Sequence, residues 1–293
     1  MKILLTGISG FVGSHLSERF LQDGHELYAI VRNSDHESRY KKKKITCFID
    51  ENPMASLVEF FEKSGIEGVV HCASRFSTEH TPEDVGDLIF SNILFSTRLL
   101  ESSVRTNVCW FINTGTFWQH YRNEVYSPVN LYAATKQAFE SIARYYMEIS
   151  AINFVTLKLN DTYGPNDTRP KIFNLWKKIA ETGASLEMSP GEQYMDIVHI
   201  DDVVDAYVRM MELLQEDNKK KFNGRVFAVS SGDLIKLKDL AVVFEKVTGK
   251  KLNILWGKKP YRKREVMAPW NKGEIVPGWK PKVSIEEGIA SLL

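Results

Sequence analysis

A tyrosine and a lysine four positions apart, Tyr132 and Lys136, have the residue types and the spacing that proton-transfer chemistry requires. On a helix, positions i and i+4 share one face, so the Lys136 ammonium can reach back toward the Tyr132 phenol. A free tyrosine has a pKa of about 10, and a neighbouring positive charge lowers it. Tyr132 can then act as a general acid or base beside a carbonyl or an alcohol. The pattern alone is common by chance, and its alternative is an ordinary pair on a helix surface.

A glycine-rich segment near the start of the chain has the form of a phosphate-binding turn. Its three glycines lie between an apolar run, Lys2–Thr6, and a segment of helical period, Phe11–Asp23. Glycine allows a tight turn and a close approach of backbone to a pyrophosphate, and the helix N-terminus that follows offers unpaired N–H groups. The alternative is a tight strand–helix turn that binds nothing. The residues that we expect to contact a dinucleotide here are Gly7, Gly10, Phe11, Val12 and Gly13.

The end of the second apolar run indicates which dinucleotide binds. A protein that binds NAD usually has an acidic residue there, which accepts a hydrogen bond from the ribose 2′-hydroxyl. Here the run Glu26–Val31 is followed by Arg32 and Asn33. A guanidinium at this position can stack on adenine and pair with a 2′-phosphate, so we expect NADPH as the cofactor. NAD stays possible through Asp35, and Arg32 can also be an ordinary surface arginine.

These groups follow elements that alternate between strand and helix. The predicted strands are Lys2–Thr6, Glu26–Val31, Thr46–Ile49, Gly68–His71, Cys109–Asn113 and Phe154–Leu159. The predicted helices are Phe11–Asp23, Ser56–Ser64, Asp84–Ser103 and Leu131–Ser150. Such alternation is typical of the α/β class, and the near-continuous apolar strands suit burial on both faces. We therefore predict a Rossmann-type, doubly wound parallel sheet.

The pattern changes after Asn160, where turn residues become frequent. A helix Asp201–Leu214, a strand Val226–Ser230 and a helix Leu237–Thr248 are predicted there. We expect residues 1–160 to form the dinucleotide-binding domain and residues 161–293 to form mainly a smaller C-terminal α+β lobe that binds substrate. Some segments of the second part, such as 193–215, can return to the first domain.

The composition indicates which classes of binding partner are not expected. The 293 residues are 43% hydrophobic and 26% charged, with a net charge of +1, which gives no reason to expect nucleic acid or a membrane surface as a partner. No apolar stretch is long enough to span a bilayer. The three cysteines, Cys47, Cys72 and Cys109, are far apart, so we expect three small buried residues rather than a disulfide framework or a metal site. A reducing cytoplasm fits this pattern, as does an N-terminal apolar run too short for a signal peptide.

The glycine spacing G-x-x-G-x-x-G, together with Tyr132 and Lys136, resembles the extended short-chain dehydrogenase/reductase family, also called the NAD-dependent epimerase/dehydratase family. The resemblance extends over nearly the whole chain, through the segments 69–74, 163–165, 196–203, 260–262 and 278–281 and through Asn92. It implies that Asp50 contacts adenine. The alternative, that Asp50 is a turn residue at the end of a strand, is nearly as well supported. It also implies that Cys72, Ala73 and Ser74 line the cofactor.

The same resemblance supplies a third catalytic group. The segment from Thr114 to Gln119 is similar to the family motif S/T-x-x-V-Y-G, which makes Thr114 the hydroxyl that hydrogen-bonds the substrate oxygen. Thr116 is the alternative, because the match is imperfect. His199 with Asp201 and Asp202 has metal-binding residue types, but a strand–helix junction explains them better, and we expect no metal.

Family members similar to this chain act on sugars carried by nucleoside diphosphates. Dehydratases have Asp and Glu directly after the catalytic Thr, where this chain has Gly115 and Thr116, so dehydration is not expected. The chain most resembles the reductases of nucleotide-linked 4-keto-6-deoxyhexoses, CDP- or dTDP-linked, which serve deoxysugar biosynthesis such as that of lipopolysaccharide O-antigen. The alternatives are an NAD-dependent 4-epimerase and a non-catalytic dinucleotide sensor that binds a protein partner.

The resemblance also suggests substrate contacts and an assembly. The expected substrate-binding residues are Thr116, Asp161, Arg169, Lys171 and Arg262. The three cations are candidates for the diphosphate, with a surface role as the alternative for each, and Asp161 stands where many relatives have Asn. Relatives pair into homodimers through the helices expected at Asp84–Ser103 and Leu131–Ser150. Apolar residues such as Leu88, Phe95 and Leu99 fit that interface or the core equally well.

Overall fold

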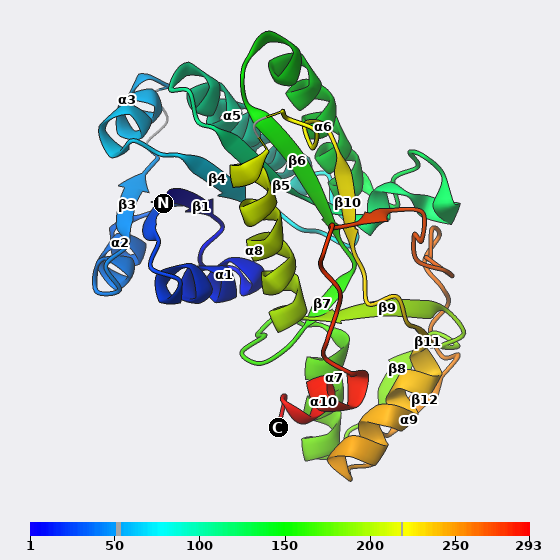
Figure 1. Cartoon of the computed structure of the whole chain (residues 1–293). Helices are drawn as coiled ribbons and strands as arrows, with labels where there is room; N and C mark the ends of the chain where they lie inside the picture. The colour runs from blue at the N-terminus through cyan, green and yellow to red at the C-terminus, as the bar shows by residue number, and fades with distance from the viewer. Residues whose placement is uncertain (51–53, 218) are drawn as a thin grey trace.

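The larger part of the protein is an eight-stranded parallel sheet, seen in the upper half of Figure 1. The computed structural model describes residues 1–50, 54–217 and 219–293. Along the sheet the strands are β13 (Glu274–Ile275), β10 (Val226–Val229), β6 (Asn153–Leu159), β5 (Trp110–Thr116), β4 (Gly68–His71), β1 (Lys2–Thr6), β2 (Glu26–Val31) and β3 (Thr46–Ile49). The Rossmann-type fold class is therefore confirmed, and the predicted bounds of the first four strands match the observed ones.

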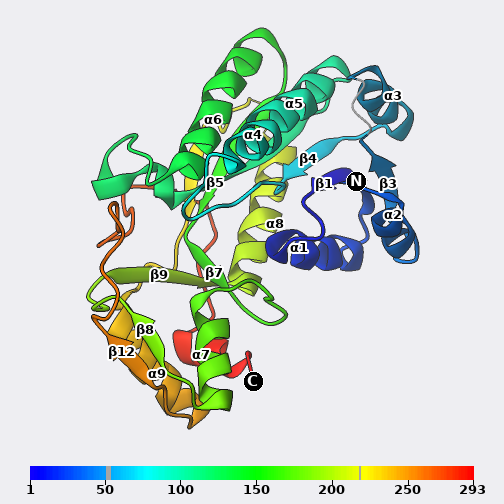
Figure 2. The ribbon, with the colours of Figure 1, turned by 180° about the vertical axis from the view of Figure 1, so that it is seen from behind.

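Helices cover both faces of this sheet because its strands are apolar on both sides. On β1, Ile3 and Leu5 belong to one core cluster and Leu4 belongs to the other, as the two-residue period of a strand requires. The first cluster includes α1 (Phe11–Gln22), α2 (Ser34–Lys41) and α8 (Ile200–Glu216), and the second includes α3 (Met54–Ser64), α5 (Phe95–Arg105) and α6 (Leu131–Ile149). In Figure 1 α8 lies in front of the sheet, and in Figure 2 α5 does.

The long helix expected at Asp84–Ser103 is divided. It consists of α4 (Asp84–Ile89), a π-helical turn η1 (Phe90–Leu94) and α5. A π turn inserts an extra residue into the helical ladder and changes which side chains face inward. Here the turn holds Asn92, which is buried.

Strand β5 is longer than expected, and this changes the position of the threonines. The prediction ended at Asn113, because Thr-Gly-Thr has the composition of a turn. Instead β5 pairs with β6 residue by residue up to Thr116, opposite Leu159. A side chain at Gly115 would lie 2.9 Å from the Lys158 Cγ, so glycine is needed where the two strands approach. Thr114 and Thr116 therefore lie within the last residues of the strand.

A smaller lobe lies below the sheet in Figures 1 and 2 and has its own core around Tyr163, Trp176 and Phe244. Its strands are β7 (Asp161–Tyr163), β9 (Tyr194–His199) and β11 (Leu234–Lys236) in one sheet, and β8 (Leu186–Met188) and β12 (Ile254–Trp256) in another. Its helices are α7 (Ile172–Thr182), α9 (Leu237–Thr248) and α10 (Ile285–Ala290). After Asn160 the chain also returns to the larger part, because α8 packs on α1 and because β10 and β13 extend the large sheet.

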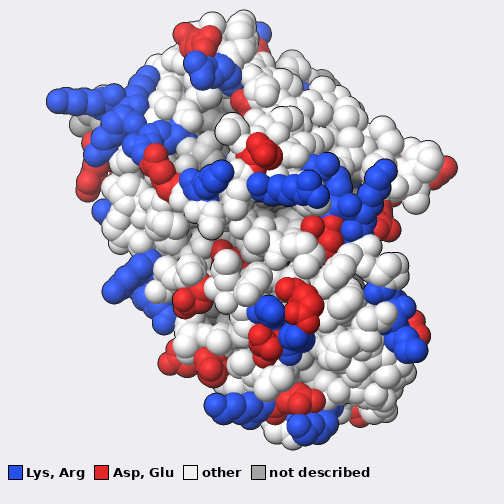
Figure 3. All heavy atoms as spheres, turned by 90° about the vertical axis from the view of Figure 1, so that its right-hand side faces the viewer, with Lys and Arg blue, Asp and Glu red and all other residues white. Residues whose placement is uncertain are grey.

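Surface features agree with the balanced composition. Acidic and basic side chains are interspersed on the face that Figure 3 shows. Within residues 1–50, 54–217 and 219–293, the structure has no helix with the length and apolar character of a bilayer span.

The expectation that all three cysteines are buried is wrong, because Cys109 is exposed in the turn that precedes β5 and the other two are half-buried. Helix α2 was not predicted, because its sequence SDHESRYK buries Tyr40 alone.

Candidate active site

The glycine turn joins β1 to α1 and leaves no room for side chains. Gly7 has a φ of +71°, and a Cβ there would lie 2.6 Å from the Ala73 N. A Cβ on Gly13 would lie 2.2 Å from the Gly7 carbonyl oxygen. Helix α1 begins after Gly10 with no side-chain cap and no acidic residue in its first turn. Its N–H groups and the positive end of its dipole are thus available to an anion.

A loop after β4 runs beside this turn, and two asparagines hold it. The Asn92 Oδ1 accepts from the Ser74 hydroxyl at 3.0 Å and from the Arg75 N at 2.8 Å, while its Nδ2 donates to Thr135 on α6 at 2.9 Å. Asn130 caps α6 through the Ala133 N, and its Nδ2 donates to the carbonyls of residues 77 and 78 at 2.9 Å each. The loop from Cys72 to Thr78 is therefore fixed against the start of α6.

Tyr132 and Lys136 lie on the first turns of α6, at the end that faces this loop. Burial raises the pKa of Tyr132 to about 12, against the opposing effects of a hydrogen bond with Ser74 and the charge of Arg169. The pKa of Tyr132 is therefore higher than we expected, and Lys136 is not among the groups that shift it. Burial also lowers the pKa of Lys136 to about 8, partly offset by Cys72 and Glu140. Among the described residues, the structure gives the Lys136 ammonium no hydrogen-bond partner.

The two threonines of β5 make different contacts. The Thr114 Oγ1 lies 2.6 Å from the Tyr207 hydroxyl and 3.4 Å from the Cys72 Sγ. The Thr116 Oγ1 accepts from the Trp118 N at 3.3 Å and begins the short 3-10 turn η2 (Phe117–Gln119). Both side chains line the same cavity, so both remain candidates for the hydroxyl that contacts substrate.

This first cavity has a volume of about 460 Å³ and gathers residues from the carboxyl ends of β1, β4, β5 and β6. It brings together Gly7, Gly10, Phe11, Val12, Gly13, Cys72, Ser74, Thr114, Thr116, Tyr132, Asp161, Arg169 and Lys171. Residues expected to bind cofactor and residues expected to do chemistry therefore share one space. This is the position at which open α/β sheets bind ligands.

The residues expected to bind the adenosine end lie at the ends of β2 and β3. Arg32 is exposed, and Asn33 accepts from the His36 N at 3.1 Å and so caps α2. Asp35 lies in the first turn of α2 and is also exposed. The Asp50 carboxylate forms a two-pronged ion pair with Arg98 of α5, at 2.9 and 3.0 Å. This ion pair with Arg98 accounts for an acidic residue at position 50 without any contact to adenine.

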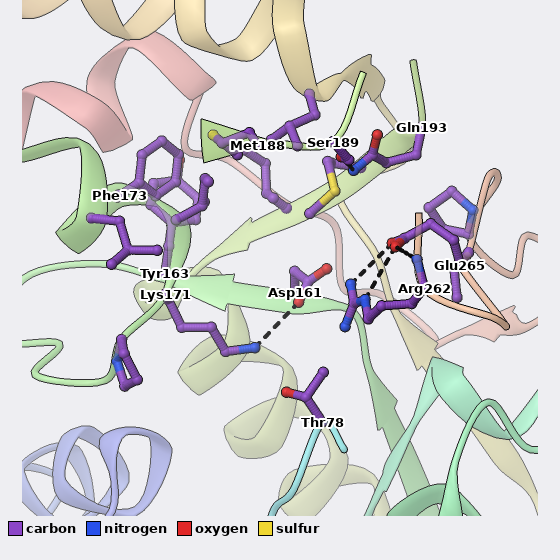
Figure 4. A pocket seen from close by; sticks show the side chains of 18 of the residues that line it. Thr78, Asp161, Tyr163, Lys171, Phe173, Met188, Ser189, Gln193, Arg262 and Glu265 are labelled. Carbon is purple, nitrogen blue, oxygen red and sulfur yellow. Dashed lines mark hydrogen bonds and ion pairs between the residues drawn. The ribbon is translucent and has the colours of Figure 1, made fainter. Parts of the chain in front are cut away.

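A second cavity, of about 430 Å³, adjoins the first and extends into the smaller lobe. The two share Thr78, Trp118, Asp161 and Lys171 in their walls. Figure 4 shows Asp161 near the centre, with the Lys171 ammonium pointing toward it at 3.6 Å. Beyond it, Arg262 is held by Glu265 through two side-chain hydrogen bonds of 3.1 and 3.0 Å.

Arg169 lies beside the glycine turn. It lines the first cavity, where its guanidinium lies over the Phe11 ring at 4.3 Å. It also pairs with Asp167 at 2.8 Å and donates to the Thr162 carbonyl at 3.0 Å. Arg169 thus lines the first cavity, Arg262 lines the second, and Lys171 lines both.

Sequence patterns missed several residues that shape the site. Phe76 lies 5.1 Å from the Tyr132 ring and 5.6 Å from the Trp118 ring, and so forms an aromatic wall across the boundary of the two cavities. Tyr207 of α8 is fully buried against Thr114. Neither residue belongs to a recognisable motif. The hydrophobic period of α8 predicts that Tyr207 faces the core, but the period carries no information about the contact of its hydroxyl.

His199 and the two aspartates after it have structural partners. The His199 Nδ1 accepts from the Asp201 N at 3.3 Å at the start of α8. The Asp202 carboxylate accepts from the backbone N–H groups of residues 282 and 283, at 2.8 and 3.1 Å. The Asp202 contacts fix the C-terminal segment to α8. Because the backbone of Asp201 contacts His199, both aspartates have structural partners.

The residues around the first cavity fit a dinucleotide. The glycine positions leave a cradle that a Cβ would fill, and α1 presents free N–H groups to it. The buried Lys136 ammonium, with its lowered pKa, is a donor suited to ribose hydroxyls. A dinucleotide lying from the glycine turn toward Tyr132 would meet complementary groups at both points.

Proteins of known name resemble the chain over nearly its whole length. CDP-abequose synthase of Salmonella muenchen is 27% identical over 298 residues, which span 100% of this chain and 97% of the relative. CDP-abequose synthase of Yersinia pseudotuberculosis is 28% identical over 271 residues, covering 92% of each chain. UDP-glucuronate 4-epimerase of Thermodesulfobacterium geofontis is 25% identical over 313 residues, covering 98% of this chain and 93% of the relative.

Solved structures share the fold. UDP-glucose 4-epimerase of Thermotoga maritima, determined with UDP-glucose, superposes with a TM-score of 0.83 at 24% identity and covers 99% of this chain and 96% of its own. UDP-glucuronic acid 4-epimerase of Bacillus cereus, determined with UDP-glucuronic acid and NAD, has a TM-score of 0.83 at 22% identity, with 99% and 97% covered. The family described as "NAD dependent epimerase/dehydratase family" matches residues 3–224. With the glycine turn, the Tyr132–Lys136 helix and the sheet order in agreement with it, the chain belongs to the NAD dependent epimerase/dehydratase family.

Proposed function

We propose that the protein reduces, with NADPH, the 4-keto group of a nucleotide-linked 4-keto-6-deoxyhexose, either CDP- or dTDP-linked. The observation that carries the proposal is that Tyr132, Thr114 and the glycine turn line one cavity, which adjoins a second with Lys171 and Arg262 in its wall. The similarity to CDP-abequose synthases over nearly the whole chain supports a sugar substrate of this kind.

Tyr132 is suited to donate a proton. A bound NADPH supplies the hydride that C4 of the sugar accepts. Because burial raises the pKa of Tyr132 to about 12, the phenol stays protonated at neutral pH. The alkoxide formed at O4 is a much stronger base than the phenolate, so Tyr132 can transfer its proton to O4. Thr114 donates a hydrogen bond to the same oxygen and polarises the carbonyl beforehand.

Lys136 is suited to stabilise the site after that transfer. Its ammonium is buried near Cys72, a residue of the cavity wall, and a phenolate left on Tyr132 would attract it more strongly there than in water. It would also hold the cofactor's ribose hydroxyls. Burial of this ammonium, with its pKa of about 8, destabilises the free protein. We therefore propose that Lys136 acts when cofactor and substrate are bound.

Dehydration of the sugar does not fit the residues after Thr114. That reaction needs a group to carry a proton at these positions in the dehydratases, and Gly115 offers none. The contact of Gly115 with Lys158 leaves no space for a side chain. The Thr116 hydroxyl is a weak acid and already accepts from the Trp118 N. Reduction therefore fits the chain better than dehydration.

The second cavity suits the nucleotide of the substrate. Lys171 and Arg262 are the cations in its wall for which we propose contact with the diphosphate. Both are paired in the free protein, Lys171 with Asp161 and Arg262 with Glu265. A phosphate group would compete with these carboxylates for the two cations. Arg169 lies beside the glycine turn, so we propose that it serves the cofactor end.

NADPH is preferred to NAD because Arg32 is exposed at the end of β2, where its guanidinium can meet a 2′-phosphate at the surface. Adding NADPH with CDP- or dTDP-4-keto-6-deoxyglucose to the purified protein tests the proposal. Loss of NADPH absorbance with formation of a 6-deoxyhexose supports it. Absence of NADPH oxidation with both sugars overturns the reductase proposal.

A 4-epimerase that uses NAD is the second candidate. It is favoured by the Bacillus cereus neighbour, which was solved with UDP-glucuronic acid and NAD, and by the UDP-glucuronate 4-epimerases among the relatives. An epimerase regenerates its cofactor in each turnover. NAD retained through purification, together with conversion of a UDP-sugar without net cofactor consumption, would select this candidate.

We also propose a homodimer through α4, η1 and α6. Leu88 and Leu99 belong to the core, but Phe90 and Leu94 of η1 and Ile149 of α6 are exposed apolar side chains. A light-scattering mass equal to that of one chain would contradict this assembly.

A further inference from the structure

A buried tyrosine outside the cavity contacts the threonine that we assign to substrate binding. Tyr207 of α8 has no exposed surface, and its hydroxyl lies 2.6 Å from the Thr114 Oγ1. Cys72 completes the group, with its Sγ 3.4 Å from the Thr114 Oγ1 and a hydrogen bond to Tyr207. Thr114 and Cys72 line the first cavity, whereas Tyr207 lies behind them.

Packing alone does not account for the Tyr207 hydroxyl. The residues around it on α8, such as Val203, Ala206 and Met210, are apolar and fully buried. A phenylalanine would fill the same volume without burying a polar atom, and a buried hydroxyl destabilises a core unless it is hydrogen-bonded. The partners that the structure gives this hydroxyl are Thr114 and Cys72, both in the wall of the cavity.

The role that we propose for Thr114 requires that, in its hydrogen bond with Tyr207, the Tyr207 hydroxyl donates and the Thr114 Oγ1 accepts. A threonine hydroxyl has one proton to donate and can accept at the same time. If Thr114 donated to Tyr207, its proton would point away from the cavity. Burial raises the pKa of Tyr207 well above the ordinary value of 10, so the phenol keeps its proton and can be the donor. The Thr114 proton, which the structure directs to the Cys72 Sγ at 3.4 Å, is then left for a stronger acceptor, an oxygen inside the cavity that Cys72 also lines.

We infer that Tyr207 is a positioning residue for the reaction: its hydroxyl donates to the Thr114 Oγ1 and directs the Thr114 proton toward the carbonyl oxygen of the sugar. The inference rests on the proposed role of Thr114. It does not depend on whether the reaction is a reduction or an epimerisation, because O4 of the sugar meets the same hydroxyl in both. No proton leaves Tyr207, and the proton that O4 gains comes from Tyr132.

The test uses Tyr207→Phe, Thr114→Val and the double variant, all in the full-length protein. Rates are measured on the CDP-, dTDP- and UDP-sugars named above and are divided by the concentration of NADPH- or NAD-binding sites. We expect Tyr207→Phe to lower kcat about tenfold, the effect of one neutral hydrogen bond, with little change in KM or in cofactor Kd. In the Thr114→Val background, removal of the Tyr207 hydroxyl should cause no further loss.

Two controls separate positioning from folding. Tyr146→Phe removes another buried hydroxyl, at the far end of α6, and should lower only the melting temperature. Tyr207→Met is a second variant without the hydroxyl, and its flexible side chain can fill the space if phenylalanine does not fold. It should show the same loss of kcat.

The possible outcomes are distinct. Wild-type kcat in either Tyr207 variant, with Thr114→Val impaired, overturns this inference and leaves the proposed function in place. Losses for Tyr207→Phe and Thr114→Val that multiply in the double variant also overturn it, because the two residues would then act separately. A wild-type protein that converts none of the sugars overturns the proposed function and this inference together.

Discussion

Because the Lys136 ammonium is buried, we expect the cofactor-free protein to be less stable than a variant that lacks this charge. Lys136→Met replaces the ammonium with an uncharged group of similar length and leaves the surrounding packing nearly unchanged. Burial moves the pKa of Lys136 from 10.5 to about 8, which corresponds to about 3 kcal/mol against folding at neutral pH. We therefore expect the cofactor-free variant to be more stable than the wild type by about this amount.

The sign of the pH dependence follows from the lowered pKa. Between a pKa of about 8 in the folded protein and 10.5 in the unfolded chain, the unfolded chain binds more protons, so wild-type stability rises with pH. The penalty is complete below the folded pKa and disappears above the unfolded one. The advantage of Lys136→Met should thus be about 3 kcal/mol near pH 7 and decline to about half of that near pH 9.5.

Denaturant titrations of both proteins without cofactor, at several pH values in that range, measure this difference. The same variant should bind NADPH more weakly, because the ammonium that would hold the ribose is gone. The matched control is Lys177→Met on α7, which removes a partly buried lysine whose ammonium has a carbonyl partner at 2.6 Å and should therefore give no gain in stability. A Lys136→Met protein that is no more stable than wild type at neutral pH, or a difference that does not change with pH, would refute the reasoning.

Two further predictions concern the cofactor end and the start of α6. Arg32→Ala should raise the Kd for NADPH about tenfold or more and leave the Kd for NADH nearly unchanged, measured by fluorescence titration, because it removes a charge-assisted contact to the 2′-phosphate. An equal effect on both dinucleotides would contradict that role. Asn130→Ala should lower the unfolding free energy by about 1 kcal/mol through loss of the α6 cap, and should lower kcat as well, because the cap also holds residues 77 and 78 beside Tyr132. A stability loss with unchanged kcat would show that the loop needs no such anchor.

The apolar strands made much of the fold predictable. β1 through β4 are short, mainly apolar runs in a parallel sheet; β1, β2 and β4 are largely buried, and β3 is the half-buried edge strand. β5 was predicted too short, because Thr-Gly-Thr resembles a turn when the partner strand is unknown. Its true end depends on Gly115 fitting against Lys158 of β6, a contact between residues far apart in the chain.

Burial explains what the site prediction missed. The spacing of Tyr132 and Lys136 places them on one helix face, but it carries no information on the dielectric around each group. Desolvation is the largest influence on the pKa of each group, so the pKa of Tyr132 rises where we expected it to fall. The stacking of Arg169 on Phe11 beside the glycine turn likewise depends on tertiary packing. Tyr207 and Phe76 reach the site only through tertiary packing.

The central claim is that Tyr132 donates the proton in reduction of a nucleotide-linked keto sugar. Tyr132→Phe removes the phenolic hydroxyl and keeps the ring that packs against Phe76. NADPH oxidation by this variant with CDP- or dTDP-4-keto-6-deoxyglucose, measured alongside its NADPH Kd, is the most direct test. We predict that turnover is abolished while NADPH binds with nearly wild-type affinity. Wild-type turnover by Tyr132→Phe would contradict the account.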